Sequence, residues 1–188
     1  MSSASALSFS HYFAYGSNLN KTQMESRLGK NEFVDIAYLS NYIFKFNKQS
    51  KIPNQGYANI EPQENETVYG VVYRITVEQL NQMDRYEGFL SEGNPNNHYD
   101  RQEVNVTLLT RMTTLKVIVY VASNKFRIIA NNLFPSDTYL TTIIVGANEV
   151  RLPQAYIDHI KAKALGNNPK LLTTAEKAEK ADTKEIKE

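Results

Sequence analysis

Short runs of β-branched and aromatic residues recur along this chain of 188 residues and limit the folds open to it. Such side chains pack well on the pleated surface of a strand, whereas a helix restricts their rotamers. Because these runs outnumber the helical segments, we expect a sheet that closes, or nearly closes, on itself. The runs cover residues 34–39, 42–46, 57–60, 68–75, 103–109, 115–122 and 139–145.

Helices are expected in three places. Two of them follow the Ser/Thr-x-x-Glu/Gln pattern of a capping box, which begins at Thr22 and again at Thr76. A third begins at Pro153, because proline is favourable in the first turn of a helix. The expected helices end at residue 28 before Gly29, run over residues 77–86, and run over residues 153–165 before Gly166.

Three irregular segments separate these elements, at residues 49–55, 61–66 and 91–97. The last is rich in Asn, Gly, Ser and Pro, and we expect it to form a surface loop or lid. From residue 170 the chain consists mainly of Lys, Glu and Ala, which predicts a disordered or frayed helical tail. We therefore expect a single domain over residues 1–169 and a charged tail over residues 170–188.

Charge and composition exclude several classes of function. Lys and Arg number 21 against 20 Asp and Glu, so a nucleic-acid partner is not expected. The absence of Cys excludes disulfides, thiolate metal sites and a cysteine nucleophile. Residues 1–8 lack the pattern of a signal peptide, and no run of about eighteen apolar residues occurs, so we expect a cytoplasmic protein without a membrane partner.

No cofactor is expected either. His11, His98 and His159 lack the spacing of metal ligands. The chain has no Gly-rich phosphate loop and no dinucleotide fingerprint. We therefore expect neither a metal nor a nucleotide cofactor.

An apolar, aromatic segment runs to Tyr15, breaks at Gly16 and passes into the start of a helix. A strand that ends in such a turn exposes backbone N–H groups, which together with a helix start form a small anion site. Ser17 lacks the Gly-x-Ser-x-Gly setting of a nucleophile, so its hydroxyl is interpreted as a turn, cap or substrate-binding group. The turn therefore predicts a site for a carboxylate or a phosphate.

One carboxylate is predicted to face inward. On the helix over residues 77–86, the helical period places Leu80, Met83, Asp84 and Glu87 on one face. Burial of the two apolar side chains would draw Glu87 out of solvent, which raises the pKa of a carboxyl toward the range useful for proton transfer. The structural alternative is a solvated charge or an ion pair with Arg85 or Arg101.

Several pieces of the chain, spread over residues 12–165, together resemble the γ-glutamylcyclotransferase family. The first motif and the Glu-Gly motif, in this order and at this separation, make the resemblance specific. The matching pieces are Tyr12-Phe13-Ala14-Tyr15-Gly16-Ser17-Asn18-Leu19, Gly56-Tyr57-Ala58-Asn59-Ile60, Gly70-Val71-Val72-Tyr73, Asp84-Arg85-Tyr86-Glu87-Gly88, Tyr99, and Tyr139 followed by Ile144-Val145-Gly146-Ala147.

The resemblance implies an α+β fold: a mixed β-barrel of about six strands, closed or nearly closed, with a few short helices around it. It also implies that the γ-glutamyl group of a γ-glutamyl amino acid or dipeptide is cyclised to 5-oxoproline without a cofactor, which releases the amine. Glu87 would be the acid and base of this reaction. The implied substrate-binding residues are Tyr12, Phe13, Ala14, Tyr15, Gly16, Ser17, Asn18, Tyr99 and Tyr139.

Because of two departures from the family pattern, the sequence does not determine which amine is released. Asn59 stands where Thr or an apolar residue is ordinary, and residues 91–97 lengthen the loop after Glu87. Intact glutathione is less favoured, because relatives that degrade glutathione carry a different N-terminal loop.

Three alternative functions therefore stay open beside the cyclisation of a γ-glutamyl amino acid or dipeptide. A γ-glutamylamine cyclotransferase and a pathway enzyme with a larger substrate would both use the same chemistry. A non-catalytic module on the same barrel would instead recruit a protein partner through the loop at residues 91–97 or through the tail. The oligomeric state, monomer or homodimer, also stays open.

Overall fold

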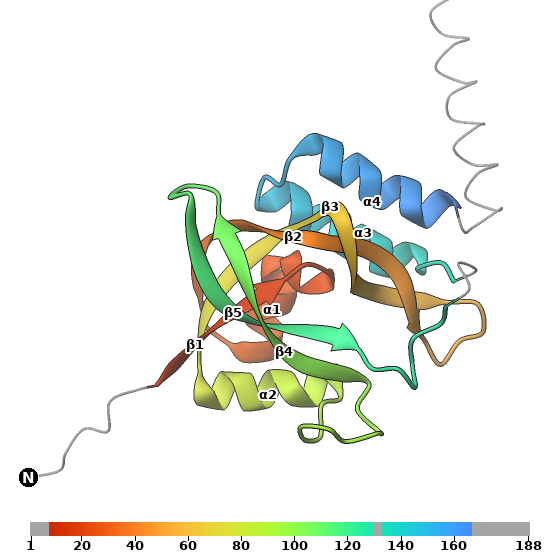
Figure 1. Cartoon of the computed structure of the whole chain (residues 1–188), viewed down its shortest axis with the longest axis horizontal. Helices are drawn as coiled ribbons and strands as arrows, with labels where there is room; N and C mark the ends of the chain where they lie inside the picture. The colour runs from red at the N-terminus through yellow and green to blue at the C-terminus, as the bar shows by residue number, and fades with distance from the viewer. Residues whose placement is uncertain (1–7, 130–132, 167–188) are drawn as a thin grey trace, which may run out of the picture.

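Five strands form a closed mixed barrel in the computed structural model, which describes residues 8–129 and 133–166 (Figure 1). The strand order is β1-β3-β2-β4-β5. All neighbouring strands are antiparallel except β1 and β5. These two strands are parallel, and Tyr12 lies opposite Ile118. The strands are β1 (Phe9–Ala14), β2 (Glu32–Gln49), β3 (Gly56–Thr76), β4 (Tyr99–Leu108) and β5 (Thr113–Ala122).

The expected barrel is confirmed, but the described residues contain five strands rather than about six. β2 joins the runs at 34–39 and 42–46, and β3 joins those at 57–60 and 68–75. The segment at 61–66, expected to be irregular, lies inside β3. Register shifts in the β2–β3 pair, one of them beside Asn41, let these long strands bend without losing their pairing.

The run at residues 139–145, expected to be a strand, lies instead in α3 (Asp137–Glu149). The Ser136 hydroxyl caps this helix by accepting a hydrogen bond from the backbone N–H of Tyr139. Composition alone does not separate a short apolar strand from a buried helical segment. Here the cap and the packing of Gly146 and Ala147 against the chain after β1 select the helix.

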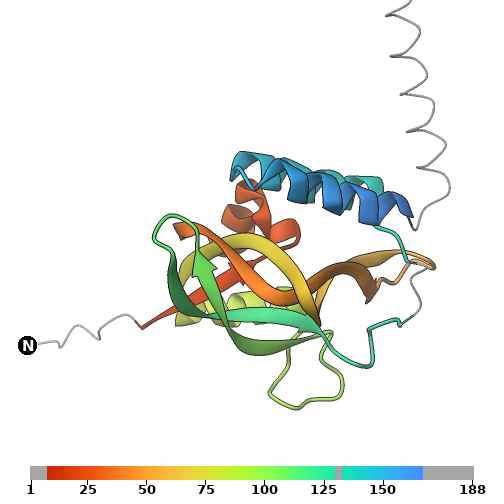
Figure 2. The same ribbon diagram turned by 45° about the horizontal axis from the view of Figure 1, so that its top comes forward.

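The other expected helices are present, with one different start. α1 (Lys21–Leu28) is capped by Asn20 rather than by Thr22, and the Asn20 side chain accepts a hydrogen bond from the Gln23 N–H. α2 (Val77–Glu87) carries the complete capping box predicted at Thr76. α4 (Gln154–Gly166) lies beside α3, and the two helices cover one side of the barrel (Figure 2).

The core fills the barrel and the spaces under the helices. Its largest fully buried side chains include Phe13, Leu19, Met24, Phe44, Ile60, Met83, Ile143 and Ile160. Among the described residues, no helix combines the length and the apolar character needed to cross a membrane. The chain leaves β1 through Gly16 into a short 3-10 helix, η1 (Ser17–Leu19), which packs between α1 and α3 and so fixes the turn against the barrel.

Candidate active site

A small cavity lies where the turn after β1 meets the end of α2. Its volume is about 30 Å³, which is room for roughly two water molecules. The residues of its wall come from β1, β3, β4 and β5, from the turn after β1, and from α2 and α3. It is lined by Tyr12, Tyr15, Gly16, Ser17, Asn18, Ala58, Glu87, Tyr99, Tyr120 and Tyr139.

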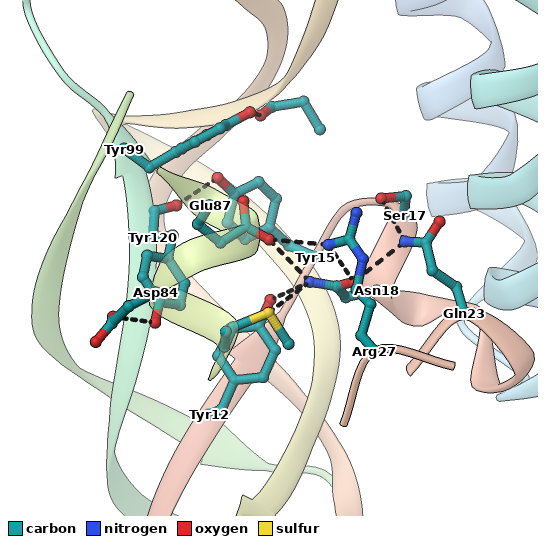
Figure 3. A network of polar contacts seen from close by, with 12 residues as sticks. Tyr12, Tyr15, Ser17, Asn18, Gln23, Arg27, Asp84, Glu87, Tyr99 and Tyr120 are labelled. Atoms are coloured by element: carbon teal, nitrogen blue, oxygen red, sulfur yellow. Dashed lines mark hydrogen bonds and ion pairs between the residues drawn. The ribbon is translucent and has the colours of Figure 1, made fainter. Parts of the chain in front are cut away.

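Glu87, the last residue of α2, is the one carboxylate on this wall among the described residues. Its side chain is 14 % exposed. Oε1 accepts hydrogen bonds from Asn18 Nδ2 at 3.1 Å and from an Arg27 guanidinium nitrogen at 3.2 Å (Figure 3). No described residue donates a hydrogen bond to Oε2.

Burial raises the pKa of Glu87, as the sequence predicted. The Arg27 and Lys48 charges and the Asn18 hydrogen bond act in the opposite direction and favour the ionised form. The ion pairs considered from the sequence, with Arg85 or Arg101, are not present. Arg101 pairs with Asp84 at 3.2 Å instead.

Asn18 connects the turn to Glu87 and is 4 % exposed. Its Nδ2 group also donates to the Tyr12 hydroxyl at 2.8 Å. Its Oδ1 atom accepts hydrogen bonds from Gln23 at 3.1 Å and from Arg27 at 3.0 Å. Because both ends of the amide are occupied, its orientation is fixed, and with it the position of Glu87 Oε1.

The tyrosine hydroxyls on the wall are held in place by hydrogen bonds. Tyr15 donates to the Tyr120 carbonyl at 2.6 Å, and Tyr99 donates to the Ala58 carbonyl at 2.8 Å. Tyr139 accepts from the Ala58 N–H at 3.2 Å. Burial raises the pKa of Tyr139 to about 12 and raises those of Tyr15 and Tyr99 as well. These hydroxyls therefore stay neutral near pH 7, and Glu87 is the group on this wall that can accept a proton.

The turn after β1 brings backbone close to the cavity. A Cβ on Gly16 would lie 3.1 Å from Ala58 Cβ and 3.6 Å from the Tyr139 hydroxyl, so a side chain there would crowd the wall. Within the described residues, no protein acceptor takes the N–H of Ser17 or Asn18. Two backbone donors of this turn are therefore without an acceptor among the described residues, and the anion site expected here stays a prediction.

The AIG2-like family model matches residues 67–160 of this chain, which is half of its length. The chain belongs to the AIG2-like family. It is 28% identical over 155 residues to the γ-glutamylcyclotransferase of Mus musculus, covering 80% of this chain and 77% of that protein. The Homo sapiens protein of the same name is 27% identical over the same length and coverage.

Solved structures agree with this assignment. The AIG2-like chain superposes on a structure named γ-glutamyl cyclotransferase with a TM-score of 0.71 and 28% identity, covering 82% of this chain and 88% of that one. These comparisons confirm the family resemblance drawn from the first motif and the Glu-Gly motif.

In this AIG2-like protein, most of the residues expected to bind substrate lie on the cavity wall. Phe13 and Ala14 do not. Side chains alternate along a strand, so Phe13 points away from the face that carries Tyr12, and its ring packs over Gly70. Ala14 is fully buried, and its carbonyl lies against Gly70 as well. These two residues help to build β1 rather than the wall.

Sequence reasoning missed several side chains that complete the site. Gln23 and Arg27 lie four residues apart on α1, so both face the turn, and this spacing was a signal that could have been used. Tyr120 had no such signal, because its place on the wall depends on closure of the barrel. Its hydroxyl donates to Asp84 at 2.6 Å, which gives Asp84 a supporting role.

A larger hollow of about 760 Å³ adjoins the small cavity and shares Ser17, Glu87, Tyr99 and Tyr139 with it. We call it the outer hollow. Its other lining residues are Gln23, Arg27, Lys48, Gln49, Ser50, Lys51, Ile52, Tyr57, Tyr86, His98 and Phe126. Asn59, one of the two departures from the family pattern, is fully buried and lines neither space.

Proposed function

We propose that this chain is a γ-glutamylcyclotransferase that converts the γ-glutamyl group of a small γ-glutamyl compound to 5-oxoproline and releases the attached amine. The observation that carries the proposal is the setting of Glu87. One of its oxygens is held by Asn18 and Arg27, the other has no hydrogen-bond donor among the described residues, and Glu87 lines a cavity. Membership of the AIG2-like family and the named relatives support the same reaction.

The reaction needs little covalent help, because the amine and the carbonyl that it attacks belong to the same γ-glutamyl group. Two obstacles remain: the amine is protonated near pH 7, and the chain must fold into attack geometry. Overall, the attacking nitrogen loses two protons, one C–N bond forms, the γ-amide C–N bond breaks, and the leaving nitrogen gains two protons. A carboxylate that accepts and returns a proton can serve both nitrogens.

Glu87 has the properties that this task requires. Its raised pKa makes it a better base than an exposed glutamate, and the Arg27 and Lys48 charges favour its ionised form. The N–H groups of Ser17 and Asn18 would hold the α-carboxylate of the substrate. Since the buried tyrosine hydroxyls stay neutral, they would donate or accept hydrogen bonds without competing for the proton.

The test is to replace Glu87 by Gln. Purified protein is incubated with a panel of γ-glutamyl dipeptides and γ-glutamyl amines, and 5-oxoproline is followed by mass spectrometry. We expect the wild-type chain to form 5-oxoproline and the Glu87→Gln variant to lose activity by at least about 100-fold, the usual contribution of a general base. Circular dichroism should show an unchanged fold.

Glu92→Gln is the matched control, because Glu92 is exposed in the loop after α2 and lines neither space. It should keep full activity. Retained turnover in Glu87→Gln would remove Glu87 from the mechanism. Binding of γ-glutamyl compounds without any consumption would favour the non-catalytic module considered from the sequence.

A further inference from the structure

Lys48 is a buried cation in the wall of the outer hollow. The residue is 5 % exposed. Its ammonium lies 5.2 Å from the ring centre of Tyr57, 5.6 Å from that of Tyr99 and 5.4 Å from that of Phe126. Within the described residues, no acidic side chain and no hydrogen-bond acceptor pairs with its Nζ atom. Aromatic faces attract a cation but do not replace an anion, so this charge has no counterion among the described residues.

The fold holds Lys48 in this unfavourable place. A register shift between Lys45 and Lys48 disturbs the alternation of β2, so that Phe46, Asn47 and Lys48 are all buried. A β-bulge of this kind redirects side chains and is common beside active sites.

A polar network fixes the bulge. Asn59 donates to Asn47 at 2.9 Å and accepts from the Ala122 N–H at 2.8 Å, which ties β2, β3 and β5 together. Asn47 in turn donates to Glu61 at 2.7 Å. This network explains the unusual Asn59 noted in the sequence: it supports the segment that carries Lys48.

The outer hollow is the space into which a leaving group would extend. It begins at Glu87, where the proton would be transferred, and Lys48 lies on the same wall. Arg27 and Lys51 add positive charge, and Glu87 is the one acidic residue on its described lining. Tyr57, Tyr86 and Phe126 offer apolar surface to a side chain.

We propose that Lys48 is a specificity-determining residue that binds the carboxylate of the departing amino acid. The proposal rests on the proposed function, because it assigns the part of the substrate that leaves. A γ-glutamyl amine has no carboxylate and would leave the Lys48 charge without a counterion, whereas a γ-glutamyl amino acid supplies a carboxylate that can accept a charge-assisted hydrogen bond from Lys48.

The experiment compares two substrates that differ only in this group, γ-glutamylalanine and γ-glutamylalanine amide. We expect wild-type kcat/KM to favour the acid by about tenfold or more, the usual effect of a charge-assisted hydrogen bond. In Lys48→Met the ratio of kcat/KM for the acid to kcat/KM for the amide should fall to about 1, mainly through a higher KM for the acid. Because Lys48 also influences Glu87, both substrates share any change in proton transfer, and the ratio of the two cancels it.

Lys125→Met is the matched control. Lys125 is exposed and also lies over the Phe126 ring, at 5.5 Å, but does not line the outer hollow. It should keep the wild-type preference. Lys48→Arg should keep most of it too, since the positive charge is retained. If Lys48→Met fails to fold, Lys48→Gln, which also removes the charge, serves as the test and should lose the preference.

The outcomes separate this proposal from the proposed function. No 5-oxoproline from either substrate would overturn the proposed function. Turnover of both substrates at equal kcat/KM by the wild-type chain would leave the function standing and overturn the role of Lys48. An equal loss on both substrates in Lys48→Met would also overturn it.

Discussion

At the scale of single residues, the two oxygens of Glu87 differ in their contacts. Oε1 is fixed in position, because Asn18 and Arg27 both donate to it. Oε2 has no hydrogen-bond donor among the described residues, and our proposal assigns the proton transfer to it. The same arrangement sets the acidity of the group, since Arg27 is the strongest of the influences that oppose burial.

Arg27→Met should move the pH dependence of activity. Removing the cation 3.2 Å from Glu87 Oε1 takes away a stabiliser of the carboxylate, so the pKa of Glu87 should rise further. We expect the acidic limb of the kcat/KM profile to shift to higher pH, as measured by initial rates of 5-oxoproline formation.

Arg85→Met controls for the loss of one positive charge near the same helix end, because Arg85 is exposed on α2 and contacts neither space. Its profile should follow that of the wild-type chain. An unshifted profile in Arg27→Met would mean that a group other than Glu87 controls the acidic limb.

At the scale of elements, the site depends on how closely α3 approaches the turn after β1. A Cβ on Gly146 would lie 2.3 Å from the Asn20 backbone nitrogen and 2.5 Å from the Leu19 carbonyl carbon. Because only a residue without a side chain fits there, α3 holds η1 against the barrel and thereby holds Ser17 and Asn18 beside Glu87.

Gly146→Ala should therefore harm both stability and activity. The added methyl group must displace backbone, and overpacking of this kind typically costs about 1–3 kcal/mol. We expect a lower free energy of unfolding in urea and a reduced kcat/KM, since the turn would shift away from Glu87.

Gly166→Ala is the control for this substitution. Among the described residues, no atom lies within 4 Å of a Cβ at Gly166, which is the last residue of α4. That variant should be as stable and as active as the wild-type chain. Full activity in Gly146→Ala would show that the turn keeps its place without the close contact.

At the scale of the whole molecule, the free energy of unfolding should record the burial of Glu87. Below its ordinary pKa of 4.5, the carboxyl is protonated in both states. As the pH rises above that value, the unfolded chain ionises first, because burial raises the pKa in the folded state. The contribution of Glu87 to stability is therefore lost between the two pKa values and stays lost at higher pH.

Glu87→Gln should not show this loss. Its free energy of unfolding minus that of the wild-type chain should increase with pH from about 4.5 and then become constant, which chemical denaturation at a series of pH values can measure. The pH at which it levels reports the folded-state pKa of Glu87. A difference that falls with rising pH would indicate a structural ion pair with Arg27 as the main role.

Local patterns in the sequence determined much of the fold and the central residue of the site. The capping box at Thr76 and the apolar face of Leu80 and Met83 were sufficient to predict α2 and the inward position of Glu87, because both depend on neighbours within one or two helical turns. The glycine turn and the Glu-Gly motif, taken together, identified the family.

Tertiary structure decided the rest, because those features depend on residues far apart in the chain. The segment at residues 139–145 is a helix since Gly146 must pack on the turn after β1, and Phe13 faces Gly70 because of its register in the barrel. Arg27 reaches Glu87, and Lys48 turns into the outer hollow, only when α1, α2 and the bulge in β2 are brought together. Local periodicity in the sequence thus predicted the inward position of Glu87, whereas closure of the barrel decided its partners and the space around it.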